Sequence, residues 1–336
     1  MGRAVVSGGA SARWIRAAME LDYFTIMPAL ARVSWRAALW WGRRRGDVRY
    51  WWRTVGREAA IANIRRAYGD ALTAAAARRA IRRCFQTQAC EESEAFFYPE
   101  LGAEGVDRVV AVQGREHLDA ALAGGCGAIV FSSHYGSMCL AIIALARLGY
   151  RMNVIARSLE PDDNPLHDAV RRYGARKVAA LERIVGSSFI LPGTPDAMAR
   201  IRAALGAGQV VYMLIDVPPE LVRHRGRVRF LGHVAEFPLG IEYLAGETGA
   251  ALVPFTVRRD APGRTHTLTV LPRVPGPEAG AGTLQRCIDV VEREIAVDPA
   301  QFFMWEYARS FWVEEPLPAT IDAGGRSGYE AGAHAT

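Results

Sequence analysis

The stretch AIVFSSHYGSMC (residues 128–139) decides the fold, because an apolar run is followed at once by a polar turn and the start of a helical segment. The run 128–133 is short and apolar, as expected of a buried strand. His134 follows it directly. In α/β proteins, ligands and catalytic groups gather at the carboxyl ends of parallel strands. The stretch therefore predicts a sheet strand with a general base at its carboxyl end.

The same alternation of short apolar runs and helical segments continues outward from this stretch. Further strands are expected at residues 151–156, 210–216, 251–257 and 267–271. Helices are expected at residues 137–148, 165–173, 196–205, 239–248 and 284–296. Such alternation predicts an α/β fold with a mostly parallel central sheet flanked by helices.

The amino-terminal third of the sequence has a different pattern of apolar residues. Apolar residues recur at helical spacing over residues 58–68 and again over 71–97. We therefore expect a helical segment over residues 1–100 and an α/β domain over 101–315. Residues 316–336 are rich in Gly, Ala and Ser and are expected to form a flexible tail.

Arginine dominates the basic residues. The chain of 336 residues has a formal net charge of +6, and Lys177 is its only lysine. An arginine surplus suits an anionic membrane face, an acidic carrier protein or a phosphorylated substrate. A genomic bias toward arginine codons would give the same composition. Nucleic acid is not an expected partner, because no recognition motif accompanies the charge.

The five cysteines favour a reducing cytoplasmic setting. Their number is odd, their spacing is irregular and no CxxC pair occurs, so neither a disulfide framework nor a zinc site is expected. The beginning of the chain has no uninterrupted apolar stretch, so we expect no cleaved signal peptide. Arg32 and Arg36 interrupt the most apolar early run, residues 26–41, which does not predict a spanning helix.

An aromatic and basic cluster in the helical segment allows two interpretations. Its members are Trp35, Trp40, Trp41, Tyr50, Trp51 and Trp52, interleaved with Arg43, Arg44 and Arg45. It resembles an interfacial anchor, which would place the protein in the cytoplasm, peripherally at the inner face of a bacterial inner membrane. The alternative is a helix packed against the catalytic domain with solvated arginines. At helical spacing, Arg32, Arg36 and Arg43 share one stripe.

His134 and Cys139 could act together. Across a strand-to-helix turn their side chains can converge, and the amino terminus of the helix would favour a thiolate. A Cys–His pair of the nucleophilic type would result. The other interpretation is that Cys139 is a small buried apolar residue.

Several further pieces, taken in order, carry a resemblance to a known family. The chain is similar, over about residues 55–312, to the lipid A biosynthesis late acyltransferases (lauroyl and myristoyl acyltransferases) of the lysophospholipid acyltransferase superfamily. The matching pieces are SH (133–134), DNPL (163–166), VVYMLID (210–216), FLG (230–232), FPLG (237–240), LAGETG (244–249), LVP (252–254) and PAQFFMW (299–305).

The resemblance implies a reaction and a set of residues. His134 would deprotonate an acceptor hydroxyl, an acidic partner would orient it, and the donor would be an acyl carrier protein or CoA thioester, without a metal or other cofactor. Asp216 matches a family aspartate, although it could also close a turn. Arg176 lies at or beside a family arginine. The substrate-binding candidates are Arg157, Asn164, Arg171, Arg176, Arg223 and Arg309, with Asn164 also suited to capping a helix.

Three departures from the family pattern leave the reaction open. Cys139 stands where the family has its acid, the closing motif around Trp305 retains only Arg309, and the amino-terminal span is weak or absent. One hypothesis is a ping-pong acyl transfer to a hydroxyl or amine through acyl-Cys139. In a direct variant, Asp216 or Glu306 supports the base. Conventional lipid A-type transfer, a thioesterase and a silent acyl- or carrier-binding scaffold are the alternatives.

The basic run RHRGRVR (223–229) also has two interpretations. It could grip a phosphopantetheine, a carrier protein or lipid phosphates. Its alternating arginines equally fit the exposed face of a hairpin strand.

Overall fold

The computed structural model describes residues 9–98, 103–157, 165–260 and 266–313, and its centre is a six-stranded sheet. In spatial order the strands are β1 (Val110–Gln113), β8 (His266–Val270), β7 (Ala251–Arg259), β2 (Ala128–Ser132), β4 (Val210–Leu214) and β3 (Met152–Val154). Only the pairing of β7 with β8 is antiparallel within this sheet. The predicted mostly parallel sheet is confirmed. The short strand β1 was not predicted.

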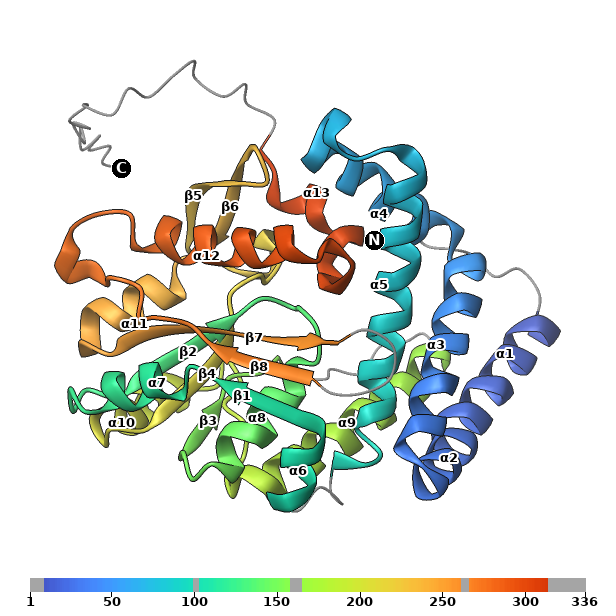
Figure 1. Ribbon diagram of the computed structural model, residues 1–336, viewed down its shortest axis with the longest axis horizontal. Helices are drawn as coiled ribbons and strands as arrows, with labels where there is room; N and C mark the ends of the chain where they lie inside the picture. Colours follow the sequence, from blue (N-terminus) through green and yellow to red (C-terminus); the bar gives the residue numbers. More distant parts are fainter. Residues whose placement is uncertain (1–8, 99–102, 158–164, 261–265, 314–336) are drawn as a thin grey trace.

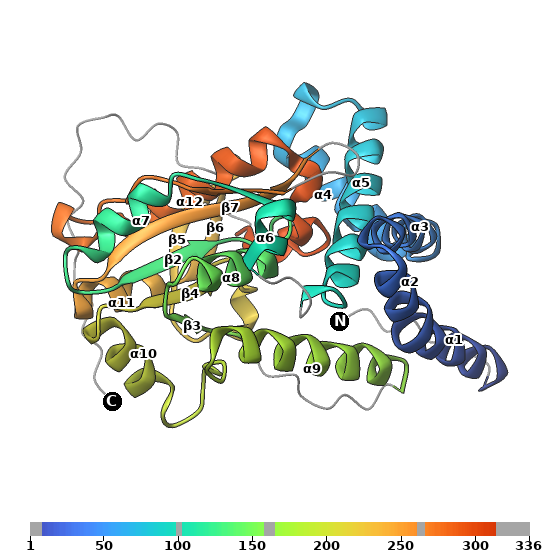
Figure 2. The same cartoon turned by 60° about the horizontal axis from the view of Figure 1, so that its bottom comes forward.

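Helices cover both faces of the sheet, as Figures 1 and 2 show. Strand β2 explains why, since Ile129 and Phe131 enter one core cluster while Ala128 and Val130 enter the other. The first face is covered by α10 (Ala197–Gly206), α11 (Gly240–Thr248) and α12 (Thr283–Val297). The second is covered by α6 (Ala103–Val109), α7 (Arg115–Leu122), α8 (Met138–Arg147) and α9 (Pro165–Val185). Helix α9 extends twelve residues beyond its predicted end at residue 173.

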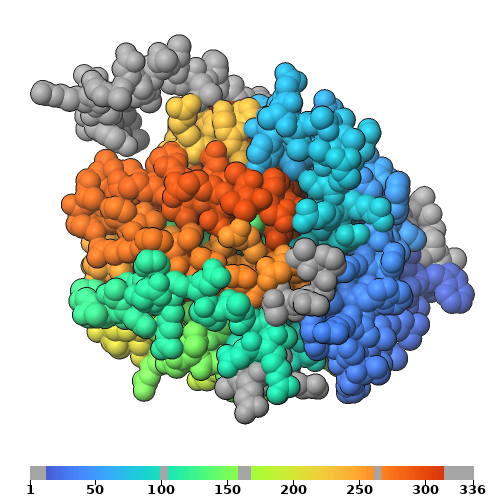
Figure 3. Space-filling view, viewed as in Figure 1, coloured from blue at the N-terminus to red at the C-terminus, as the bar shows by residue number. Residues whose placement is uncertain are grey.

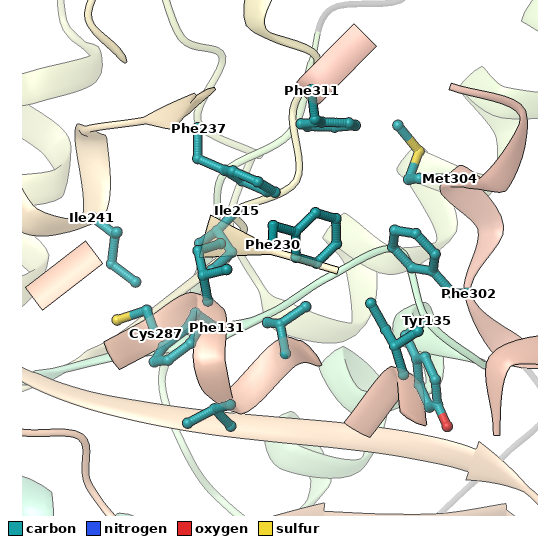
Figure 4. Close-up of a cluster of buried hydrophobic side chains, with 14 of the residues drawn as sticks. Phe131, Tyr135, Ile215, Phe230, Phe237, Ile241, Cys287, Phe302, Met304 and Phe311 are labelled. Atoms are coloured by element: carbon teal, nitrogen blue, oxygen red, sulfur yellow. The ribbon is translucent and has the colours of Figure 1, made fainter. Parts of the chain in front are cut away.

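Residues 225–229 of the basic run lie in a hairpin with their arginines exposed, which confirms the second interpretation of the alternating pattern. Strands β5 (Arg225–Phe230) and β6 (His233–Pro238) pair antiparallel. Their inward rings, Phe230 and Phe237, pack edge to face with centroids 5.0 Å apart. Phe311 stacks on Phe237 and Phe302 closes the cluster (Figure 4). Both rings come from the carboxyl-terminal part of the chain, which forms η7 (Pro299–Gln301), η8 (Phe303–Glu306) and α13 (Ala308–Phe311). Phe302 lies between η7 and η8, and Phe311 is the last residue of α13.

The amino-terminal segment is mostly helical in its described residues and forms one side of the molecule (Figure 3, blue and cyan). It contains α1 (Gly9–Leu21), the π-helix η1 (Asp22–Ile26), α2 (Met27–Val33), α3 (Trp35–Trp52), α4 (Thr54–Tyr68), η2 (Gly69–Ala71) and α5 (Ala74–Glu94). At the extended Ser34, whose Oγ accepts a hydrogen bond from the Arg36 amide, the chain turns between α2 and α3. The expected single stripe of Arg32, Arg36 and Arg43 is therefore wrong, because no continuous helix carries all three.

A charged cluster holds these helices together. Arg45 pairs with Asp22 (2.5 Å) and with Glu92 (3.0 Å), and Arg49 pairs with Glu92 at 2.7 Å. Burial alone would raise the pKa of Glu92, but the charges of Arg49 and Arg45 outweigh it and lower this pKa to about 2. In the described residues, none of the helices is both long and apolar enough to cross a bilayer.

Candidate active site

The register of the sheet brings His134 beside Asp216. Strands β2 and β4 are parallel neighbours, with Ser132 opposite Leu214. Beyond this pair the Ile215 amide still donates to the Ser132 carbonyl at 3.0 Å. His134 and Asp216 each lie two residues past that opposed pair, so the two carboxyl ends present them to each other.

His134 and Asp216 form a doubly hydrogen-bonded pair. His134 Nδ1 lies 2.8 Å from Asp216 Oδ1, and the His134 backbone amide donates to Asp216 Oδ2 at 2.7 Å. The Asp216 side chain is 1% exposed, whereas the His134 ring is 34% exposed. Burial lowers the pKa of His134, but the charge and hydrogen bond of Asp216 outweigh this and raise it above its ordinary value. The carboxylate thus fixes the ring and leaves Nε2 without a partner among the described residues.

The turn after His134 is anchored on both sides. The His134 carbonyl accepts from the Phe303 amide (2.8 Å), while Gly136 donates to the Gln301 carbonyl and Ser137 to the Val257 carbonyl. Gly136 has φ +60°, and a Cβ there would lie 1.8 Å from the Val257 oxygen, so only glycine fits. These contacts fix the backbone on both sides of His134.

A base oriented by a carboxylate at a sheet edge suits acyl transfer, and comparison with known proteins identifies the family. The model of the bacterial lipid A biosynthesis acyltransferases matches residues 49–307. This chain belongs to that family. The resemblance predicted from the sequence is confirmed, and with it an enzyme class that transfers acyl groups.

Two curated relatives come from Mycobacterium tuberculosis, strains CDC 1551 and H37Rv. Both are named phosphatidylinositol mannoside acyltransferase. Each is 29% identical to this chain over 203 residues. The match covers 60% of this chain and 60% of each relative.

Cys139, which stands where the resemblance places an acid, has different neighbours from His134. It is the second residue of α8, close to Glu91 of α5 and Lys177 of α9. Burial is the largest influence on the thiol and raises its pKa well above the ordinary value, despite the opposing charge of Lys177. No hydrogen bond joins Cys139 to His134 in the described part of the chain. The carboxylate beside His134 is instead that of Asp216, two residues after β4.

Glu91 and Lys177 were missed by the sequence analysis. Lys177 Nζ donates to Glu91 Oε1, and both side chains are largely enclosed, 16% and 5% exposed. Their charges reach His134, because Glu91 raises and Lys177 lowers the pKa of its imidazole. The one available signal was that Lys177 is the only lysine of the chain.

The arginine candidates do not gather at one place. Arg157 is exposed beside a cavity that also contains Glu182 and Arg200, and Arg171 pairs with Asp168 at 2.6 Å. Arg176 lies over the Phe24 ring, 4.6 Å from its centroid. None of these contacts involves His134.

The remaining candidates lie toward the hairpin or outside the described residues. Arg223 is exposed just before β5, and Arg309 Nη1 donates to the Trp312 carbonyl at 2.9 Å. Asn164 is outside the described residues. Glu306, the other carboxylate considered for the base, pairs with Arg53 at 2.8 Å.

Proposed function

We propose that the protein transfers an acyl group from an acyl carrier protein or CoA thioester to a hydroxyl or amine, with His134 as the general base. The observation that carries this proposal is the His134–Asp216 pair at the edge of the sheet. One ring nitrogen is held by a buried carboxylate, and the other remains for an acceptor.

The reaction follows from this arrangement. Nε2 of His134 takes the proton of the acceptor hydroxyl as its oxygen attacks the thioester carbonyl carbon. The C–S bond then breaks, and the leaving thiolate takes the proton back from the imidazolium. Asp216 stays ionised throughout and stabilises the imidazolium.

The oxyanion of the tetrahedral intermediate needs a hydrogen-bond donor from outside the turn at residues 134–137. The amides of His134, Tyr135, Gly136 and Ser137 already donate to Asp216, Ser133, Gln301 and Val257 respectively. The first turn of α8 and the Lys177 ammonium are the nearby positive groups that could serve.

Direct transfer is favoured over an acyl-Cys139 intermediate. A nucleophilic cysteine needs thiolate character, and burial opposes it at Cys139. Asp216 also supplies the orienting carboxylate whose absence from position 139 had motivated the covalent route. Cys139 is then a small side chain packed against Glu91 and Lys177.

For the acceptor we propose a glycolipid hydroxyl. This rests on the names of the two mycobacterial relatives and of the bacterial lipid A biosynthesis acyltransferase family. A lipid acceptor requires access to a membrane. Trp40, Trp51 and Trp52 of α3 are all more than half exposed, which suits peripheral attachment at the inner face of a bacterial inner membrane. The exposed arginines before and along β5 would suit an acidic carrier protein.

Intact-mass analysis with an acyl-carrier thioester, paired with product detection, tests the proposal. We expect product without a protein adduct, retained in Cys139→Ala and lost in His134→Ala. An adduct that disappears in Cys139→Ser would establish the covalent route instead. Release of free acid at the same rate with and without acceptor would indicate a thioesterase, and no turnover of any donor would indicate a scaffold.

A further inference from the structure

A basic cavity lies between α2, the end of α5 and α9. Its volume is about 350 Å³, and its wall includes the rings of Phe96 and Tyr173. Three arginines line it, Arg32 from α2 and Arg176 and Arg183 from α9, together with Lys177. Cavities of this size suit a polar head group better than a long acyl chain, because small-molecule sites begin at roughly 300 Å³.

The positive charge of this cavity is not balanced by its own lining. None of the described residues that line it is acidic. In the described part of the chain, Arg32, Arg176 and Arg183 make no ion pair with a carboxylate, although Arg183 Nε donates to the Ala179 carbonyl at 3.2 Å. Lys177 is paired with Glu91. The guanidinium group of Arg176 lies over the face of the Phe24 ring, which holds the group in place, and its in-plane N–H groups can still donate to a ligand. Three guanidinium groups that line one cavity are suited to phosphate, because each can donate two parallel hydrogen bonds to its oxygens.

Lys177 connects this cavity to the catalytic pair. It lines the cavity, contacts Cys139, and lies near enough to His134 for its charge to act on the imidazole. Lys177 is therefore shared between the cavity wall and the surroundings of Cys139, at the start of the helix that follows His134.

We propose that this cavity binds a phosphate ester of one substrate and thereby positions that substrate against His134. The inference rests on the acyl-transfer function proposed above. Two sources share this chemistry: the phosphodiester of a phospholipid-anchored acceptor, and the phosphopantetheine or CoA phosphates of the donor. In either case Arg32 and Arg183 are positioning residues, because they act on the substrate away from its reacting atoms.

Calorimetric titration of the full chain with two probes tests the site without requiring turnover. Glycerol 3-phosphate stands for the lipid head group, and adenosine 3′,5′-bisphosphate stands for the donor. We expect at least one probe to bind, more weakly at about 0.15 M salt than at low ionic strength. In the double variant Arg32→Gln/Arg183→Gln, binding should weaken at least about 10-fold, because a hydrogen bond to a charged group is lost at each position.

Two control variants make the result specific. Arg79→Gln removes an exposed arginine of α5 that does not line the cavity, and it should bind the probes like the wild type. His134→Ala should also retain binding, so a failure of the catalytic proposal would leave this test intact. With an active preparation, the double variant should raise the KM of the phosphate-bearing substrate about 10-fold with kcat nearly unchanged. The site is overturned if neither probe binds the wild type, or if the double variant binds as tightly as Arg79→Gln.

Discussion

Asp216 at the sheet edge and Glu92 in the helical layer are both carboxylates enclosed with a basic partner, yet their surroundings differ. Asp216 directs both oxygens to His134, whose ring is 34% exposed and keeps one nitrogen for chemistry. Glu92 is held by the guanidinium groups of Arg45 and Arg49 and by the Tyr23 hydroxyl. The first pair can move a proton, whereas the second only joins helices. Under the proposed mechanism, the free ring nitrogen of His134, and not the burial of the carboxylate, distinguishes the catalytic pair from the structural one.

Removal of the ring at position 134 should have the largest effect. His134→Ala should lower the rate of acyl transfer about 10³–10⁴-fold, as expected for loss of a general base. The melting temperature should also fall, because the buried Asp216 carboxylate then keeps only the backbone amide of residue 134 as a partner. Steady-state kinetics and thermal unfolding measure the two effects separately. A variant that keeps a tenth of the wild-type rate would remove His134 from the chemistry.

Replacement of the Asp216 carboxylate by a neutral amide should have the second largest effect on the rate. Asp216→Asn keeps the shape of the side chain but no longer favours the Nδ1–H tautomer of His134. We expect kcat to fall about 10²–10³-fold, less than for loss of the ring itself. Asp298→Asn is a matched control, since that carboxylate caps η7 and pairs with Arg83, with no contact to His134.

Substitution of Glu92 should lower stability and leave the rate unchanged, unlike the substitutions of His134 and Asp216. Glu92→Gln leaves Arg45 and Arg49 without their shared carboxylate and should cost about 3 kcal/mol of unfolding free energy, with kcat unchanged where the variant is folded. Urea titration measures this. Because the pKa of Glu92 is lowered to about 2, its contribution is present above the ordinary glutamate range near pH 4.5 and is lost as pH falls toward 2. The variant should therefore lose less stability than the wild type across that interval.

The smallest effect is expected at position 139. Cys139→Ala should change the rate of acyl transfer by less than about threefold, because a spectator thiol contributes only packing. Pre-steady-state measurements should show no burst of released carrier or CoA. A burst in the wild type, together with loss of activity in Cys139→Ala, would instead identify Cys139 as the nucleophile that accepts the acyl group.

The sequence predicted the architecture well because apolar spacing determines it. The central strands 128–132 and 210–214 and the helices around them follow directly from their apolar runs. Asp216 was a candidate for a different reason, because it matches an aspartate of the resembling family and follows a predicted strand at its carboxyl end. The spacing alone could not show that Asp216, which follows another strand, lies beside His134. That required the register of β2 against β4.

Contacts between distant segments were the part that the sequence could not supply. Glu91 lies in a helix that looks like an ordinary solvated one, and its approach to Lys177 depends on how α5 and α9 pack. The break at Ser34 likewise interrupts a stretch whose spacing predicts one helix. Both features arise from tertiary packing, which local propensity does not encode.

The most direct test of the central claim is the pH dependence of kcat/KM for the wild type and Asp216→Asn. A general base acts in its neutral form, so the rate should fall as pH decreases through the pKa of His134. Because Asp216 raises this pKa, the wild-type inflection should lie above about 6.5. In Asp216→Asn it should move to lower pH, together with the lower plateau. Inflections at the same pH in both proteins would contradict the assignment of Asp216 as the group that orients and charges the base.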